Sequence, residues 1–127
     1  MTNSGKTVIA IVDDEETILK GLERLLRSAG LAAKTFATGV DFLRSLENGT
    51  PDCLVLDLNM MPMNGLAVLD RLALSDRKLP VIVITGDDRE EIHQAAVSRG
   101  IAAFLRKPVE DEALLDAIDK AIRPIEP

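Results

Sequence analysis

Residues 8–12 read Val-Ile-Ala-Ile-Val and residues 81–84 read Val-Ile-Val-Ile, two runs without a single polar position. A strand that is apolar on both faces belongs in the middle of a parallel sheet, because helices cover both sides of such a sheet. Similar short runs, rich in branched side chains, recur along the chain. Together they predict five strands, at Thr7–Val12, Ala32–Phe36, Cys53–Leu56, Val81–Thr85 and Ala102–Leu105.

The segments between these runs have the spacing of helices. The first places five apolar residues on one stripe and ends at Gly30, and two later segments, near residues 66–73 and 114–122, repeat this pattern. A second segment, around Phe42, is shorter, and a fourth, Arg89–Arg99, has the weakest apolar stripe and is expected to shift most easily. Strand and helix thus alternate five times, which predicts an α/β fold with a parallel sheet and helices on both faces.

Composition narrows the class of protein. The chain has 127 residues, which suits a single domain, with a core expected at about residues 7–122 and a tail or severed linker at residues 123–127. No apolar run reaches the roughly 18 residues of a membrane span, and the polar start lacks a secretory signal. With the single Cys53, these features predict a cytoplasmic protein. A net charge of −6 and an aromatic content of three Phe argue against direct nucleic-acid binding.

Polar residues follow the predicted strands. Asp13 and Asp14 come after the first, Asp57 after the third and Lys107 after the fifth, while Thr85 ends the fourth. In open parallel sheets the carboxyl ends of the strands form the binding edge, so these side chains are expected to meet. Carboxylate ligands without a nearby His or Cys suit Mg²⁺, and Mn²⁺ would fit the same ligands. Asp57 is the expected nucleophile for a phosphoryl group, once metal and lysine offset the charge.

With these motifs, the chain resembles the receiver domain of two-component response regulators over nearly its whole length. The resemblance implies a flavodoxin-like sheet with strand order 2-1-3-4-5 and five helices. It also implies a role for each matching residue: Asp57 as phosphoacceptor, Asp13, Asp14, Asp57 and the backbone carbonyl of Asn59 as metal ligands, Thr85 and Lys107 as catalytic groups, Thr85 and Phe104 as the switch pair, and Gly86 and Asp87 beside the phosphoryl group.

One loop departs from the family pattern. After Asp57 the family usually has Pro at the position of Met61, whereas this chain has Pro62 one residue later and keeps the spacing to Gly65. This change affects the expected stiffness of the loop and leaves the predicted ligand Asn59 in place.

Simpler interpretations exist for single residues. Asp13 and Asp14 could cap a helix, Thr85 could merely continue a strand, and Phe104 could be an ordinary core residue. The fourth helix carries His93, which is expected to face solvent. The coincidence of all the polar residues at one sheet edge favours the functional interpretation.

The resemblance implies a phosphorylation-driven signalling switch that promotes its own phosphorylation and dephosphorylation without being a turnover enzyme. A histidine kinase or histidine phosphotransfer protein would supply the phosphoryl group to Asp57. The downstream protein target is not specified, and a phosphorylation-dependent dimer is compatible with the family.

The sequence argues against three other classes of protein. A phosphatase of the haloacid dehalogenase type needs a second Asp two positions after its nucleophile, where this chain has Glu15 or Asn59. A nucleotide- or flavin-binding domain needs a glycine-rich first loop, where this chain has four acidic residues, 13–16. A docking module that is never phosphorylated would not need the full set of polar residues.

Overall fold

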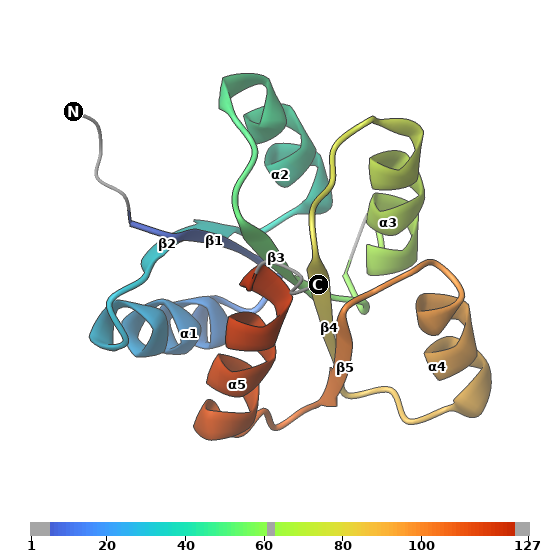
Figure 1. Ribbon diagram of the computed structural model, residues 1–127. Coiled ribbons are helices and arrows are strands. Elements are labelled where there is room, and N and C mark those ends of the chain that lie inside the picture. Colours follow the sequence, from blue (N-terminus) through green and yellow to red (C-terminus); the bar gives the residue numbers. More distant parts are fainter. Residues whose placement is uncertain (1–5, 61–62, 124–127) are drawn as a thin grey trace.

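The strand order of the sheet is the one expected. A computed structural model describes residues 6–60 and 63–123. In it five parallel strands pair in the order β2-β1-β3-β4-β5, and Figure 1 shows them as the central layer between helices. The prediction of a doubly covered parallel sheet is therefore confirmed.

Strands and helices alternate along the chain. Their bounds are β1 (Val8–Val12), α1 (Glu16–Ser28), β2 (Ala32–Phe36), α2 (Gly39–Ser45), the 3₁₀ turn η1 (Leu46–Asn48), β3 (Cys53–Asp57), α3 (Gly65–Leu74), β4 (Val81–Thr85), α4 (Glu90–Val97), β5 (Ala103–Arg106) and α5 (Asp111–Ile122). Most predicted bounds agree within one residue. β3 reaches Asp57, which is thus the last residue of the strand, and β5 lies one residue later than predicted.

Two separate apolar cores flank the sheet. Helices α1 and α5 cover one face, packing through residues such as Leu26 and Leu114 on alternate strand positions that include Ile9 and Val55. Helices α2, α3 and α4 cover the other face, where Phe42 is fully buried (Figure 1). Because β1, β3 and β4 contribute to both cores, they carry no polar residue before their carboxyl ends.

The N-termini of the helices show which polar residues act as helix caps. Thr38 caps α2 and Asn64 caps α3, each accepting a hydrogen bond from a backbone N–H three residues later. Helix α1 has Glu15 at its N-cap and no side-chain cap. Asp13 accepts a hydrogen bond from the Glu15 N–H, at 2.9 Å, before the helix begins. The interpretation of the Asp13–Asp14 pair as a helix cap is therefore wrong.

Helix α4 is shorter than the predicted Arg89–Arg99 and buries only Ala96 fully. The pair Arg99–Asp70, at 2.8 Å, ties the segment after α4 to α3. Such a small buried surface fits the expectation that α4 moves most easily.

Two features of the sequence lie outside the described residues. These are the departure at Met61 and Pro62, and the tail beyond Arg123. Within residues 6–60 and 63–123, no helix is long and apolar enough to cross a membrane.

Candidate functional site

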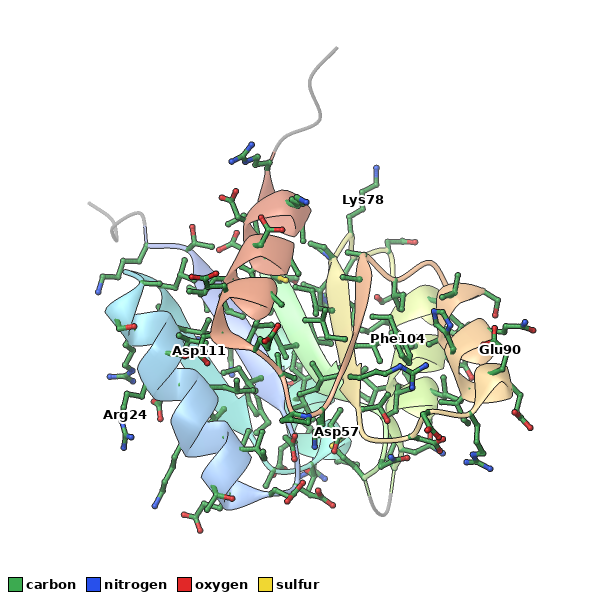
Figure 2. All side chains as sticks on the ribbon, turned by 90° about the horizontal axis from the view of Figure 1, so that it is seen from below. Arg24, Asp57, Lys78, Glu90, Phe104 and Asp111 are labelled. Atoms are coloured by element: carbon green, nitrogen blue, oxygen red, sulfur yellow. The ribbon has the colours of Figure 1, made fainter. Side chains whose placement is uncertain are left out.

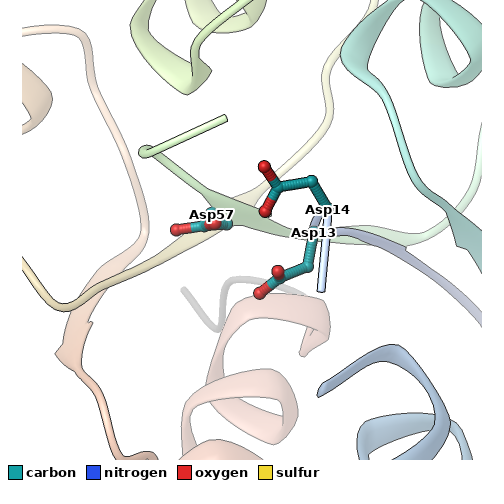
Figure 3. Close-up of side chains that lie close together, drawn as sticks. All are labelled: Asp13, Asp14 and Asp57. Atoms are coloured by element: carbon teal, nitrogen blue, oxygen red, sulfur yellow. The ribbon is translucent and has the colours of Figure 1, made fainter. Parts of the chain in front are cut away.

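Three carboxylates meet at the carboxyl edge of the sheet. β1 leads directly into Asp13 and Asp14, and the neighbouring strand β3 ends in Asp57. One oxygen from each carboxylate lies within 4.8 Å of the others, and the side chains are grouped in Figure 3. The prediction that these residues come together is borne out by this geometry.

The carboxylates differ in their exposure to solvent. Asp13 and Asp57 are 0% and 1% exposed, whereas Asp14 is exposed. Two buried carboxylates this close repel one another and need a compensating positive charge. Among the described residues, the Oδ2 atom of Asp13 has an ion pair with Lys107 at 3.0 Å but accepts no hydrogen bond, so it keeps an electron pair for a cation. A hard divalent cation fits this set of oxygen donors.

Lys107 supplies a positive charge that compensates the buried carboxylates. It follows β5, and its Nζ lies 3.0 Å from Asp13 Oδ2 and 3.5 Å from Asp57 Oδ2. A third carboxylate, Glu15, accepts a hydrogen bond from the same ammonium at 3.3 Å. Although burial opposes it, these acidic neighbours hold the pKa of Lys107 above its ordinary value. The lysine is therefore a cation at neutral pH at the edge of the sheet.

Asp57 has the properties of a buried carboxyl held beside another acid. Burial, followed by the charge of Asp13, raises the pKa of Asp57 to about 6, against the opposing effects of Lys107 and of the Asn59 N–H. That N–H donates to Asp57 Oδ1 at 3.2 Å. At neutral pH the carboxylate is thus ionised but poorly stabilised, which suits a group that reacts at its oxygen.

Thr85 connects the loops after β3 and β4. Its hydroxyl oxygen is buried and accepts hydrogen bonds from the Asn59 side-chain amide, at 3.2 Å, and from the Asp87 N–H, at 3.0 Å. The neighbouring Gly86 has open space where a Cβ would lie. Asn59 therefore connects Asp57 to Thr85, the residue predicted at this edge from its position at the end of the fourth strand.

The Asp87 side chain faces a different partner. It forms an ion pair with Arg89, whose Nη2 is 2.7 Å from Asp87 Oδ2. Hydrogen bonds from Arg89 lower the pKa of Asp87 to about 2. Sequence analysis did not predict this pair, although the spacing of two residues within one loop is a usable signal.

Phe104 lies at the side of the sheet near α4, as Figure 2 shows. It is partly buried against the core formed with α2, α3 and α4. The ring of His93 packs on it with centroids 4.5 Å apart, and the Arg106 guanidinium lies 5.8 Å from its ring centre. The expectation that His93 faces solvent is only partly right: its side chain is 38% exposed, but α4 also turns its ring towards Phe104 of β5.

Comparison with known proteins agrees with this architecture. A model of the response regulator receiver domain family matches residues 9–119. The response regulator protein TmoT of Ectopseudomonas mendocina is 36% identical over 121 residues, which make up 95% of this chain and 55% of that protein. The DNA-binding transcriptional regulator NtrC of Escherichia coli is 34% identical over 91% of this chain and 24% of the regulator.

Solved structures show the same similarity. A response regulator receiver protein from Burkholderia phymatum is 35% identical, with a TM-score of 0.82 over 96% of this chain and 99% of that one. A CheY-like receiver domain from Methanospirillum hungatei is 25% identical, with a TM-score of 0.87 and coverages of 93% and 94%. The chain belongs to the response regulator receiver domain family, whose members are phosphorylation-dependent signalling switches.

The curated relatives are longer than the matched segment. The chain spans about half of TmoT and about a quarter of NtrC. The output of such a longer protein does not follow from the receiver residues alone.

Proposed function

We propose that Asp57 accepts a phosphoryl group from a phosphohistidine of a histidine kinase or histidine phosphotransfer protein. One observation carries the proposal. A carboxylate that is 1% exposed ends β3 between two further acids and a lysine whose Nζ is 3.5 Å away. This arrangement supplies a nucleophile and the groups that offset the charge of a phosphoryl group.

Each residue of the site has its own role in the proposed phosphoryl transfer. An Asp57 oxygen attacks phosphorus while the bond from phosphorus to the imidazole nitrogen breaks, and the imidazole leaves with the electron pair. Asp13, Asp14, Asp57 and the Asn59 carbonyl would hold Mg²⁺, with Mn²⁺ as a substitute. The ion would neutralise the carboxylates and the phosphoryl oxygens. Lys107 binds one phosphoryl oxygen by charge. Because the residues provide the reaction site themselves, the domain promotes its own phosphorylation and dephosphorylation without turning over a substrate.

The signal then reaches the surface through Thr85 and Phe104. The buried Thr85 hydroxyl would donate to a phosphoryl oxygen and move towards Asp57, leaving space into which the Phe104 ring turns. Gly86 offers open space beside the phosphoryl group, and Asp87 follows it at the border of the site. The surface of α4, β5 and α5 would change, for a downstream protein or a second phosphorylated copy to recognise.

A groove of about 270 Å³ beside the site suits the phosphodonor. It runs between α1 and the start of α5 and includes Ile18, Leu22, Lys107 and Pro108. Lys107 lines it together with mainly apolar residues, so a helix that carries a phosphohistidine would lie against α1 and α5 with its phosphoryl group directed at Asp57.

The working unit is proposed to be residues 7–122 as one receiver domain in the cytoplasm, where a phosphohistidine partner of a two-component system resides. The net charge of −6 argues against nucleic-acid binding by these residues. This argument does not extend to any longer protein of which they form part, because one matched relative is named as a DNA-binding regulator.

Intact mass measures the reaction directly. The protein is incubated with acetyl phosphate, with and without Mg²⁺, as wild type and as Asp57→Asn. We expect a labile, Mg²⁺-dependent gain of one phosphoryl group in the wild type alone. Absence of that gain, or its persistence in Asp57→Asn, contradicts the proposal and favours a docking module that is not phosphorylated at this site.

A further inference from the structure

Glu15 is a carboxylate at the edge of the site that the proposed transfer does not use. Its backbone is fixed, because its N–H donates to Asp13 at 2.9 Å and its carbonyl accepts from the Leu19 N–H at 3.1 Å. From this anchored position its side chain reaches the loop after β5 and accepts a hydrogen bond from Lys107, 92 residues later in the chain. This contact is specific, because it joins two loops that each also contribute to the site.

The Lys107 ammonium is surrounded by carboxylates. Asp13, Glu15 and Asp57 lie 3.0, 3.3 and 3.5 Å from its Nζ. An ammonium has three N–H groups, and among the described residues the Glu15 carboxylate is the one that accepts a hydrogen bond from it, while Asp13 and Asp57 are ion-pair partners. A phosphoryl oxygen that binds Lys107 competes with these carboxylates for the same charge.

The three carboxylates are not equally replaceable. The Asp13 and Asp57 side chains are 0% and 2% exposed, whereas the Glu15 side chain is 60% exposed. Moving a buried carboxylate away from its cation leaves an uncompensated charge in the interior, but an exposed one is rehydrated. Glu15 is therefore the partner that Lys107 gives up most readily.

We propose that Glu15 is a positioning residue that occupies, before phosphorylation, the place on Lys107 that a phosphoryl oxygen takes afterwards. This inference rests on the proposed role of Asp57. Glu15 keeps the ammonium extended at the edge of the site, and its release accompanies phosphorylation. Since the two acceptors compete for one cation, weakening Glu15 strengthens the binding of the phosphoryl group.

Glu16 provides a matched control. It is the next residue, it carries the same charge, and its side chain is 77% exposed. Its partner is Lys20, at 3.2 Å, on the solvent side of α1. A general effect of removing negative charge near the site would appear in Glu16→Gln as well, whereas competition for Lys107 appears only in Glu15→Gln.

The test compares wild type, Glu15→Gln and Glu16→Gln by two measurements. The first is titration of each Mg²⁺-loaded protein with beryllium fluoride, which mimics a phosphoryl group on a carboxylate. An exposed ion pair is worth up to about 1 kcal/mol, so Glu15→Gln is expected to bind the mimic roughly two- to fivefold more tightly. The second is the ¹⁵N NMR signal of the Lys107 ammonium before the mimic is added, which should shift in Glu15→Gln and stay in place in Glu16→Gln.

Each result decides the question. Equal binding by the two variants, weaker binding by Glu15→Gln, or an unmoved Lys107 signal overturns the role of Glu15. If the wild type itself fails to bind the mimic, or if Asp57→Asn binds it equally well, the proposed phosphoacceptor site is what fails. The two proposals are thus separated by the wild-type titration.

Discussion

Replacing Asp57 by Asn should stabilise the protein at neutral pH. The pKa of Asp57 is about 6 in the folded protein against an ordinary value of 3.8, a rise of about two units. Each unit corresponds to about 1.4 kcal/mol, so ionised Asp57 lowers the free energy of unfolding at pH 7 by at most about 3 kcal/mol. Asn keeps the shape but removes this charge from beside Asp13, and a gain of about 1–3 kcal/mol is expected.

The pH dependence follows from the sign of the shift. Because the folded pKa is raised, the destabilisation is absent below the unfolded value of 3.8, grows as the pH rises from 3.8 to about 6, and is complete above about 6. The advantage of Asp57→Asn should therefore be full at pH 7 and should shrink steadily towards pH 4. Urea denaturation in buffer with EDTA, at several pH values in this range, measures it.

Asp87→Asn is the control with the opposite sign. Hydrogen bonds from Arg89 lower the pKa of Asp87 to about 2, so its carboxylate contributes stability that is present above the unfolded pKa and is lost as the pH falls through 3.8 towards 2. This variant should be less stable than wild type at pH 7. The reasoning about Asp57 is refuted if Asp57→Asn shows no gain at pH 7, or a gain that does not change between pH 7 and pH 4.

Three further predictions concern the metal, the switch and the loop after β3. Added Mg²⁺ should raise the thermal midpoint of the wild type progressively with concentration, as followed by circular dichroism, and should raise that of Asp14→Asn by less. Equal shifts in both proteins would show that Asp14 is not a ligand. Thr85→Ala loses an oxygen that accepts two hydrogen bonds and should cost about 1–2 kcal/mol in urea denaturation. It should still be phosphorylated but without the NMR change at Phe104, whereas Thr85→Ser keeps that change; a preserved change in the Ala variant would disprove the coupling. Gly65→Ala places a Cβ 2.6 Å from the Asp57 carbonyl oxygen, so it should destabilise the protein by about 1–3 kcal/mol and slow phosphorylation. Gly21→Ala places a Cβ with no atom within 4 Å and should stabilise α1 by up to about 1 kcal/mol. Similar effects of the two substitutions would contradict this account.

The predictable part of the molecule is the part that depends on backbone pattern. Two-sided apolar runs identify the central strands, and the rule that parallel strands share a carboxyl edge predicts that Asp13, Asp57 and Thr85 come together. Their positions depend only on where strands end, which the sequence marks by a change from apolar to polar residues.

The contacts that sequence analysis missed depend on side-chain direction. His93 packs on Phe104 because of the rotation of α4, which a stripe of only three apolar residues cannot define. Glu15 binds Lys107 because of rotamers on two loops 92 residues apart. No periodicity in one sequence records such pairings, since they are fixed only when the chain has folded.

The two cores on opposite faces of the sheet divide the protein into halves with different tasks. The groove proposed for the phosphodonor belongs to the layer with α1 and α5, whereas Phe104 packs with α4 in the other layer. Side chains more than about 7–10 Å apart with no shared neighbours usually contribute independently. The α1 side of the groove can therefore diverge by mutation without changing the packing of α4, whereas α5 and the few residues at the carboxyl edge take part in both tasks.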